Sequence, residues 1–194
     1  MNDISAWVEQ AKTGNRLALN QLIDYYQNDI FRFVYYRIHH QADAEDVTQD
    51  VFVQVIKRIR SLKDVTRFKP WLYQIALNRV RDFFRKKRLL FFMGTASDIE
   101  TNENSIDASD VTEKEIFRKE FTTLLKKLSN EFSKWEREIF LLKYVDDMDV
   151  KDISIILGKN ENTVKTHLYR ALNKFKKHKA LREFIQRGGH ELSN

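Results

Sequence analysis

Residues 149–175 read DVKDISIILGKNENTVKTHLYRALNKF, two short helical patterns on either side of a glycine. The first runs from Asp149, which is placed to cap it, to Leu157, and Gly158 follows it in a turn. The second starts at Glu161 and has one apolar side and one polar, basic side. A short helix, a turn with glycine and a second helix form the helix-turn-helix pattern. The stretch predicts such a unit, with an ordinary helical hairpin as the alternative.

The polar side of the second helix is suited to the major groove of DNA. It carries Asn162, Thr166, Tyr169, Arg170 and Asn173, with Lys165 and Lys174 at its margins. Short polar groups and guanidinium groups can reach base edges, whereas lysines contact phosphates. The basic run from Lys174 to Lys179 favours DNA binding over a plain hairpin.

The composition outside this stretch predicts a chain that is almost entirely helical. One proline and five glycines in 194 residues are too few for the many tight turns of a β protein. The absence of cysteine excludes disulfide scaffolds, thiolate zinc sites and thiol nucleophiles. The longest apolar run, Leu89 to Met93, is far too short for a membrane span, and the start shows no secretory signal. We therefore expect a soluble, cytoplasmic protein with no membrane insertion.

The charge is distributed in three blocks. Residues 1–88 carry 16 bases and 10 acids, residues 89–112 carry no base and 5 acids, and residues 113–194 carry 18 bases and 13 acids. These blocks sum to the net charge of +6. Within the acidic block, residues 94–112 are rich in Ser, Thr, Asn and Asp and have no sustained apolar period, which is typical of a linker. A long surface loop within one domain is the less favoured alternative, because such loops are uncommon in compact folds. We predict an all-α fold of two small helical domains, 1–90 and 113–194, joined by a flexible acidic linker at 91–112.

The first domain is predicted to be a helical bundle. Apolar residues at positions i, i+3, i+4 and i+7 occur in Leu19–Tyr26, Phe31–Ile38 and Phe52–Ile59. These patterns predict three helices that bury their stripes against one another. Pro70 suits the first position of a fourth helix, which runs toward Arg88.

The third of these helices opens with an acidic face. Asp43, Asp46 and Asp50 share one side, and Glu45 and Gln49 lie beside them. Acids in a first turn favour the helix dipole, which makes a solvated face the simplest interpretation. A metal site would need ligands from several elements, and no partner cluster is evident. A docking face for a basic surface is the third interpretation, and composition alone favours the solvated face.

The fourth helix has a face that suits a nucleic-acid strand. The arc opposite its apolar side carries Trp71, Gln74, Ile75, Asn78, Arg81, Asp82 and Arg85. From residue 57 to residue 88 the chain holds 12 bases and 2 acids. Such a density allows counterion release along a phosphate backbone, and an aromatic ring among the bases can stack on an unpaired base. Alternatively, the bases from Arg85 to Arg88 only stabilise the C-terminal end of the helix, but a helix end needs fewer than four consecutive bases.

Enzymatic chemistry has no support in the sequence. A Ser/His/Asp set, a glycine loop for phosphates and an HExxH motif are all missing. The histidines have no companions at ligand spacing. We therefore expect no catalytic residue, no metal and no cofactor.

Four motifs in order resemble a known family. They are AEDVTQDVF at 44–52, WLYQIALN at 71–78 with Asp82 and Arg85, EREIFLLKY at 136–144, and NTVKTHLYRA at 162–171. The first two are similar to the AEDxxQExF and WLxxIAxNxxxDxxR signatures of bacterial RNA polymerase sigma factors of the sigma-70 family. The last two resemble the second domain of that family. The small two-domain size is typical of the extracytoplasmic function (ECF) subfamily.

The resemblance implies three binding surfaces. The core polymerase would contact Asp43, Glu45, Asp46, Gln49, Asp50 and Phe52. The single-stranded −10 promoter element would contact the loop before the fourth helix and the helix itself, through Arg67, Lys69, Trp71, Gln74, Asn78, Arg81, Arg85 and Lys86. The −35 element would contact Asn162, Thr163, Lys165, Thr166, His167, Tyr169, Arg170 and Lys174.

The same resemblance implies the partners. A sigma factor of this kind would bind the clamp and flap regions of core RNA polymerase and promoter DNA, and an anti-sigma factor could restrain it. It would direct promoter-specific initiation without being an enzyme. Two alternatives from other classes remain open, a stand-alone helix-turn-helix transcription regulator and an RNA-binding or nuclease-like protein.

Overall fold

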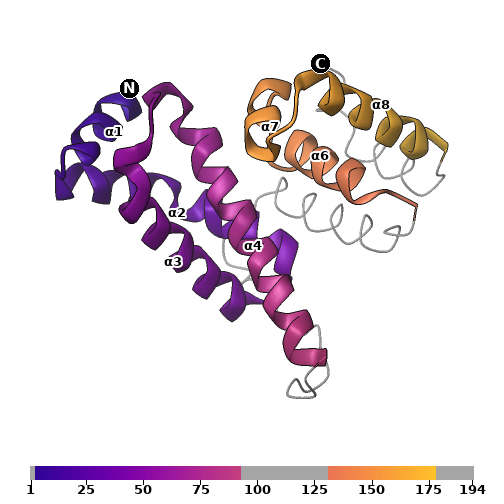
Figure 1. The fold of residues 1–194 in the computed structure, drawn as a ribbon, viewed down its shortest axis with the longest axis horizontal. Helices are drawn as coiled ribbons and strands as arrows, with labels where there is room; N and C mark the ends of the chain where they lie inside the picture. The colour runs from indigo at the N-terminus through magenta and orange to yellow at the C-terminus, as the bar shows by residue number, and fades with distance from the viewer. Residues whose placement is uncertain (1–2, 93–130, 178–194) are drawn as a thin grey trace, which may run out of the picture. The chain divides into compact units, whose positions relative to one another are not determined.

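The computed structural model describes residues 3–92 and 131–177, and these residues contain helices and no strand. The all-α prediction is therefore confirmed. The chain divides into two compact units, each described by itself below. Figure 1 shows helices α1 to α4 in the first unit and α6 to α8 in the second. The predicted linker at 91–112 lies outside the described residues, apart from its first two positions, which continue α4.

The first unit begins with a helix that the apolar pattern did not predict. Helix α1 spans Ile4–Lys12, and the carboxylate of Asp3 caps it by accepting a hydrogen bond from the N–H of Ala6 at 3.1 Å. Val8 and Ala11 are buried where α1 packs against α2. With only two buried residues, the helix has too short an apolar stripe to stand out in the sequence.

Helix α2 spans Arg16–Ile38 as one continuous helix of 23 residues. The prediction of two separate helices at 19–26 and 31–38 was therefore wrong. The residues between the two stripes, Gln27, Asn28 and Asp29, are polar and exposed, but none of them is a helix breaker. Asn15 caps the start by accepting hydrogen bonds from the N–H groups of residues 17 and 18 at 2.9 and 3.2 Å.

Two histidines form the tight corner between α2 and α3. His39 ends α2 in the left-handed region at φ 59°, a conformation that only a minority of non-glycine residues adopt. His40 begins the next helix, where its Nδ1 accepts a hydrogen bond from the N–H of Asp43 at 3.3 Å. These contacts give both histidines a structural role at a helix boundary.

Helix α3 spans Gln41–Arg58 and leads through two 3₁₀ turns, η1 at Ile59–Ser61 and η2 at Val65–Arg67, into α4 at Phe68–Phe92. Helices α2, α3 and α4 pack against one another in a bundle. The largest fully buried side chains include Phe33, Phe68 and Leu72. Complete burial of one such side chain contributes about 1.5–3 kcal/mol.

The second unit contains α6 at Lys134–Tyr144, α7 at Val150–Leu157 and α8 at Glu161–Lys177. All three pack around a small core that includes Ile139, Leu142 and Ile153. The sequence also has an apolar stripe at Phe121, Leu124, Leu125 and Leu128, which predicts a further helix. This stripe and the basic residues beyond 177 lie outside the described ranges.

None of the helices within residues 3–92 and 131–177 has the length and apolarity needed to cross a bilayer.

Candidate functional site

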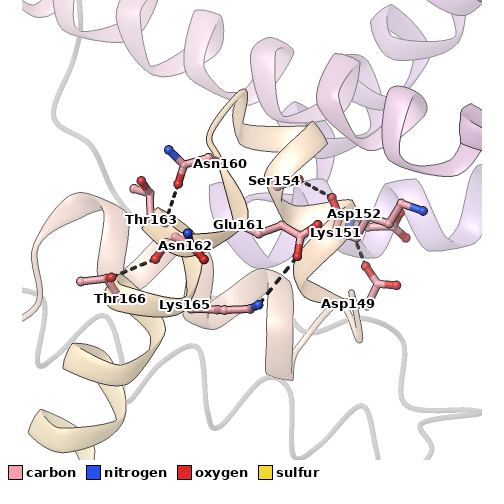
Figure 2. A network of polar contacts seen from close by, with 10 residues as sticks. All are labelled: Asp149, Lys151, Asp152, Ser154, Asn160, Glu161, Asn162, Thr163, Lys165 and Thr166. Carbon is pink, nitrogen blue, oxygen red and sulfur yellow. Dashed lines mark hydrogen bonds and ion pairs between the residues drawn. The ribbon is translucent and has the colours of Figure 1, made fainter.

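The helix-turn-helix of the second unit is built by local capping (Figure 2). Asp149 accepts a hydrogen bond from the N–H of Asp152 at 2.6 Å and so caps α7, as the sequence predicted. Gly158 ends α7 at φ 61°, where a side chain would be strained. The side chain of Asn160 accepts a hydrogen bond from the N–H of Thr163 at 2.7 Å, which sets the start of α8 at Glu161.

Helix α8 presents a polar face to solvent. Its exposed residues include Asn162, Lys165, Thr166, Tyr169 and Arg170. On the opposite side Val164 and Ala171 are fully buried. Exposed aromatic and guanidinium groups beside short polar ones are the side chains that reach base edges in a major groove. The predicted division of α8 into an apolar and a polar side is confirmed.

Two polar residues of this face already have local partners. Lys165 Nζ lies 3.8 Å from the carboxylate of Glu161, one turn earlier, with both side chains largely exposed. An exposed pair of this kind contributes less than about 1 kcal/mol, so a phosphate can displace the carboxylate. The hydroxyl of Thr166 donates to the carbonyl of Asn162 at 2.8 Å, and its oxygen can still accept a second hydrogen bond.

The predicted residues Thr163 and His167 lie at the edge of the face and are only partly exposed. The Nδ1 of His167 is buried and makes no hydrogen bond to the described residues. These two side chains therefore offer less surface to a ligand than Arg170 does.

Lys174 takes a position that the sequence did not predict. Its Nζ lies 2.6 Å from Oε2 of Glu136, whose side chain is 5% exposed. The lysine therefore connects α8 to α6 across 38 residues of sequence, and its charge is engaged inside the unit. Lys174 was predicted to contact the −35 element, but its ammonium group is already paired with Glu136.

Glu136 is also part of a capping box at the start of α6. Its carboxylate accepts a hydrogen bond from the N–H of Ser133 at 2.8 Å, and its own N–H donates to the hydroxyl of Ser133 at 3.3 Å. Burial opposes the ionised form of Glu136, but the hydrogen bonds from Lys174 and Ser133 outweigh burial and lower its pKa. The carboxylate is therefore charged at neutral pH.

A second contact fixes the turn of the helix-turn-helix on the same helix. Lys159 Nζ lies 4.0 Å from the ring centroid of Trp135, a cation–π distance. Trp135 thus contacts the turn through Lys159, and Glu136 contacts α8 through Lys174. Neither contact is apparent from the sequence, although the S-x-x-E pattern at 133–136 is a local signal for the capping box.

The basic surface of the first unit lies on η2 and α4. Lys69, Asn78 and Lys86 are exposed, and Trp71 and Gln74 are partly exposed. The ring of Trp71 packs on the buried Phe68 with centroids 5.8 Å apart, which holds the indole in place while part of it remains accessible. These residues follow one another along α4, as the predicted strand-binding face requires.

Acidic residues organise the arginines on this surface. Asp82 accepts from Arg79 at 2.6 Å and from Arg85 at 2.9 Å, and the Arg85 side chain is 79% exposed. On η2, Asp64 lies 3.1 Å from Arg67 and also accepts hydrogen bonds from the N–H and hydroxyl of Thr66. Asp64 and Asp82 are the two acids among the 12 bases of residues 57–88, but the sequence did not indicate that they would orient the arginines. Arg81, which also belongs to the predicted −10 set, is partly exposed.

The acidic face of α3 is only partly as predicted. Glu45, Asp46, Gln49 and Asp50 are all exposed. Asp46 and Asp50 make no side-chain hydrogen bond or ion pair with any residue that the structure describes. Their charges are therefore available to a partner.

Two other residues of the predicted docking set point elsewhere. Phe52 is 8% exposed and belongs to the core of the bundle, because it lies on the side of α3 that packs inward. The carboxylate of Asp43 lies 3.9 Å from Nζ of Lys87 of α4. It is thus partly engaged within the unit.

No group of three or more His, Cys, Asp or Glu side chains could hold a metal ion among the residues that the structure describes.

Two family descriptions match the chain. "Sigma-70 region 2" matches residues 22–89, and "Sigma-70, region 4" matches residues 120–175. Together they span well over half of the sequence, and they contain most of α4 and nearly all of α8.

Curated relatives agree with these matches. The ECF RNA polymerase sigma factor BldN of Streptomyces coelicolor is 29% identical over 166 residues, which cover 85% of this chain and 61% of BldN. The ECF RNA polymerase sigma factor SigW of Bacillus subtilis is 26% identical over 174 residues, which cover 88% of this chain and 93% of SigW. The chain thus spans about three fifths of BldN and nearly all of SigW.

Solved structures have a similar fold. CnrH, in complex with the cytosolic domain of CnrY, has a TM-score of 0.63 at 20% identity, covering 95% of this chain and 97% of CnrH. The sigma factor RpoE of Bartonella quintana, in complex with the anti-sigma factor NepR, has the same TM-score and identity, covering 86% of this chain and 96% of RpoE.

Proposed function

Since the chain belongs to the ECF subfamily of the sigma-70 RNA polymerase sigma factors, which direct transcription initiation, we propose that its two units recognise two separate promoter elements. The observation that carries this proposal is the division of α8 into a buried side and an exposed side with Asn162, Lys165 and Arg170. A helix of this kind can enter the major groove of the −35 element and contact both base edges and phosphates.

The first unit would bind the single-stranded −10 element. Trp71 offers a ring for stacking on an unpaired base, and Asn78 offers an amide that can recognise a base edge. Lys69 and Lys86 would contact the phosphates on either side. Because Phe68 holds the indole of Trp71, little conformational freedom is lost when a base stacks on it.

The polymerase would dock on the exposed acids of α3. Asp46 and Asp50 share one side of the helix and are free of internal ion pairs with the described residues. Complementary charge increases the rate of association and fixes the orientation of the partners. A basic surface on the polymerase clamp fits this face, and the second unit would lie near the flap. The chain would act in the cytoplasm, where core polymerase and promoter DNA are found.

An anti-sigma factor is the remaining partner that we propose. CnrH and RpoE have the same fold, and each is found in complex with a second protein, CnrY and the anti-sigma factor NepR respectively. A partner that covers α3 or α8 of this chain would block polymerase or DNA and so restrain initiation.

Reconstitution with core RNA polymerase tests the proposal. The purified chain should bind the core enzyme in a pull-down and support transcripts from defined start points on genomic templates. Binding to duplex DNA without polymerase, and no start-point selection with it, would instead favour a stand-alone regulator. Metal-dependent cleavage of nucleic acid would indicate a nuclease.

A variant of α8 tests base recognition. Arg170→Ala should weaken promoter binding by roughly 1–3 kcal/mol where the promoter contains the preferred −35 element, and by much less where the promoter lacks it. Lys176→Ala is a matched control, because it removes another exposed cation from the same helix. The control variant should weaken promoter binding to a similar degree on all templates, and it should slightly lower the salt dependence of that binding. Equal effects of the two variants on every template would count against base recognition by Arg170.

A further inference from the structure

A shallow pocket of about 310 Å³ lies on the surface of the first unit, where α1 packs against α2. Its walls are Trp7 from α1 and Gln21, Asp24 and Tyr25 from α2. None of these residues belongs to the surfaces assigned above to polymerase or DNA. Trp7 and Gln21 also precede the part of the chain that matches sigma-70 region 2, which starts at residue 22.

Two aromatic rings form a corner in this pocket. The centroids of Trp7 and Tyr25 lie 6.2 Å apart, and their planes meet at 70°. Tyr25 is 47% exposed, so its ring is accessible to a ligand. The face of one ring and the neighbouring ring can enclose a flat cationic group, since the face of an aromatic ring carries negative charge density.

The other two walls add hydrogen-bond acceptors. Gln21, Asp24 and Tyr25 are spaced i, i+3 and i+4, so their side chains share one side of α2. Asp24 is exposed, and its carboxylate makes no hydrogen bond or ion pair with the residues that the structure describes. By contrast, the nearby acid Glu9 of α1 lies 3.8 Å from Lys12. The pocket therefore combines two rings, one unengaged carboxylate and one amide oxygen.

This combination selects one kind of ligand. An anion would be repelled by Asp24, and an apolar side chain would remove the carboxylate from water without compensation. A guanidinium group is planar, stacks on aromatic faces and donates two parallel hydrogen bonds to a carboxylate. An ammonium group can make the charge contact, but it cannot stack or bind the carboxylate in this bidentate way.

We propose that the pocket between α1 and α2 binds an arginine side chain of a partner polypeptide. Trp7 and Tyr25 would enclose the guanidinium, Asp24 would accept its paired N–H donors, and the amide oxygen of Gln21 would accept a further one. Arginine and exposed aromatic residues are the side chains that dominate the energy of many protein interfaces. The site is separate from promoter recognition, so each of the two proposals can fail without the other.

The test uses the full-length chain labelled with ¹⁵N and the peptide acetyl-Gly-Arg-Gly-amide as probe. The indole N–H signal of Trp7 is identified by its loss in Trp7→Phe. This signal and the side-chain amide of Gln21 should shift in a saturable way, with a Kd on the order of millimolar. The same peptide with citrulline, which is a neutral isostere, should cause no saturable shift, and the lysine peptide should bind several-fold more weakly.

Two variants with the same change in charge separate the pocket from general electrostatics. Asp24→Asn should weaken arginine binding by roughly tenfold. Asp29→Asn is the matched control, because Asp29 is an exposed acid on the same helix that does not line the pocket. The Tyr25→Phe variant should still bind the arginine peptide, because it retains an aromatic ring, whereas the Tyr25→Ala variant should not bind it. The unchanged remainder of each spectrum shows that the variant is folded.

Three kinds of result would overturn the proposal. The first is the absence of any Trp7 shift at tens of millimolar peptide. The second is equal binding of the citrulline peptide, or equal loss in Asp24→Asn and Asp29→Asn. The third is a shift of the Trp7 signal with protein concentration alone, which would make the pocket a contact between copies of this chain.

Discussion

Replacing Lys174 with methionine removes the charged end of the ion pair between α8 and α6 but keeps an apolar stem of similar length. In the native chain the Nζ of Lys174 lies 2.6 Å from a carboxylate oxygen of Glu136. The variant leaves Glu136 buried with only its capping contacts to Ser133. Helix α8 should therefore be held less firmly against α6.

The size of the effect follows from the burial of the two partners. Breaking a fully buried pair costs about 3–5 kcal/mol, and a hydrogen bond to a charged group contributes about 1.5–3 kcal/mol. The Lys174 side chain is 41% exposed, so solvent screens part of the interaction. We expect a loss of about 2 kcal/mol in the free energy of unfolding of the second unit.

Hydrogen exchange measures this loss in the full-length chain, because it resolves the two units separately. The most protected amides of α6 and α8 should exchange about 30-fold faster in Lys174→Met, since each factor of ten corresponds to about 1.4 kcal/mol. Amides of α2 and α3 should be unchanged. Lys165→Met is the matched control, because its pair with Glu161 is exposed and should contribute less than about 0.5 kcal/mol.

The effect should also depend on pH. The folded-state pKa of Glu136 is lowered from its ordinary value of 4.5, chiefly because the contacts with Lys174 and Ser133 outweigh burial. A group with a lowered pKa stabilises the fold fully above its ordinary pKa, and the stabilisation is lost as the pH falls through the folded-state pKa. The difference between the native chain and Lys174→Met should thus be complete at pH 7 and shrink below about pH 4.5. Equal exchange in Lys174→Met and Lys165→Met, or a difference that does not change with pH, would refute this account of the ion pair.

Three further perturbations test the other surfaces. The double variant Asp46→Lys with Asp50→Lys should abolish binding to core polymerase in a pull-down while hydrogen exchange stays native, and normal binding would remove the docking assignment. Trp71→Ala should weaken binding of a single-stranded −10 oligonucleotide by roughly 1–3 kcal/mol in fluorescence anisotropy, whereas an unchanged affinity would show that no base stacks there. Asn160→Ala should destabilise the start of α8 by about 1 kcal/mol and Asn160→Asp by much less; equal hydrogen exchange in the two would argue against the cap.

The helix-turn-helix could be predicted closely from local signals. The positions of Asp149, Gly158 and Glu161 in the sequence mark a cap, a turn and a helix start, and the structure places each of them as expected. These signals act over three or four residues, so they can be read without knowledge of the fold. Promoter-contact roles were inferred only from family resemblance and stay predictions.

Features that depend on contacts between distant residues could not be predicted. The pairing of Lys174 with Glu136 joins positions 38 residues apart, and no local pattern distinguishes this lysine from its basic neighbours. Phe52 lies in a motif that resembles a docking segment, but its direction is set by the packing of α3 in the bundle. The two apolar stripes at 19–26 and 31–38 belong to one helix, because the exposed polar residues between them cost an α-helix little.

The two carboxylates of the basic surface, Asp64 and Asp82, carry a consequence for measurements at different ionic strengths. They already neutralise part of the charge of Arg67, Arg79 and Arg85 before any strand arrives. A phosphate that takes over one of these guanidinium groups exchanges one anionic partner for another, and fewer mobile ions are set free. The proposed binding of single strands by the first unit should consequently weaken with added salt less steeply than the number of its basic residues alone predicts.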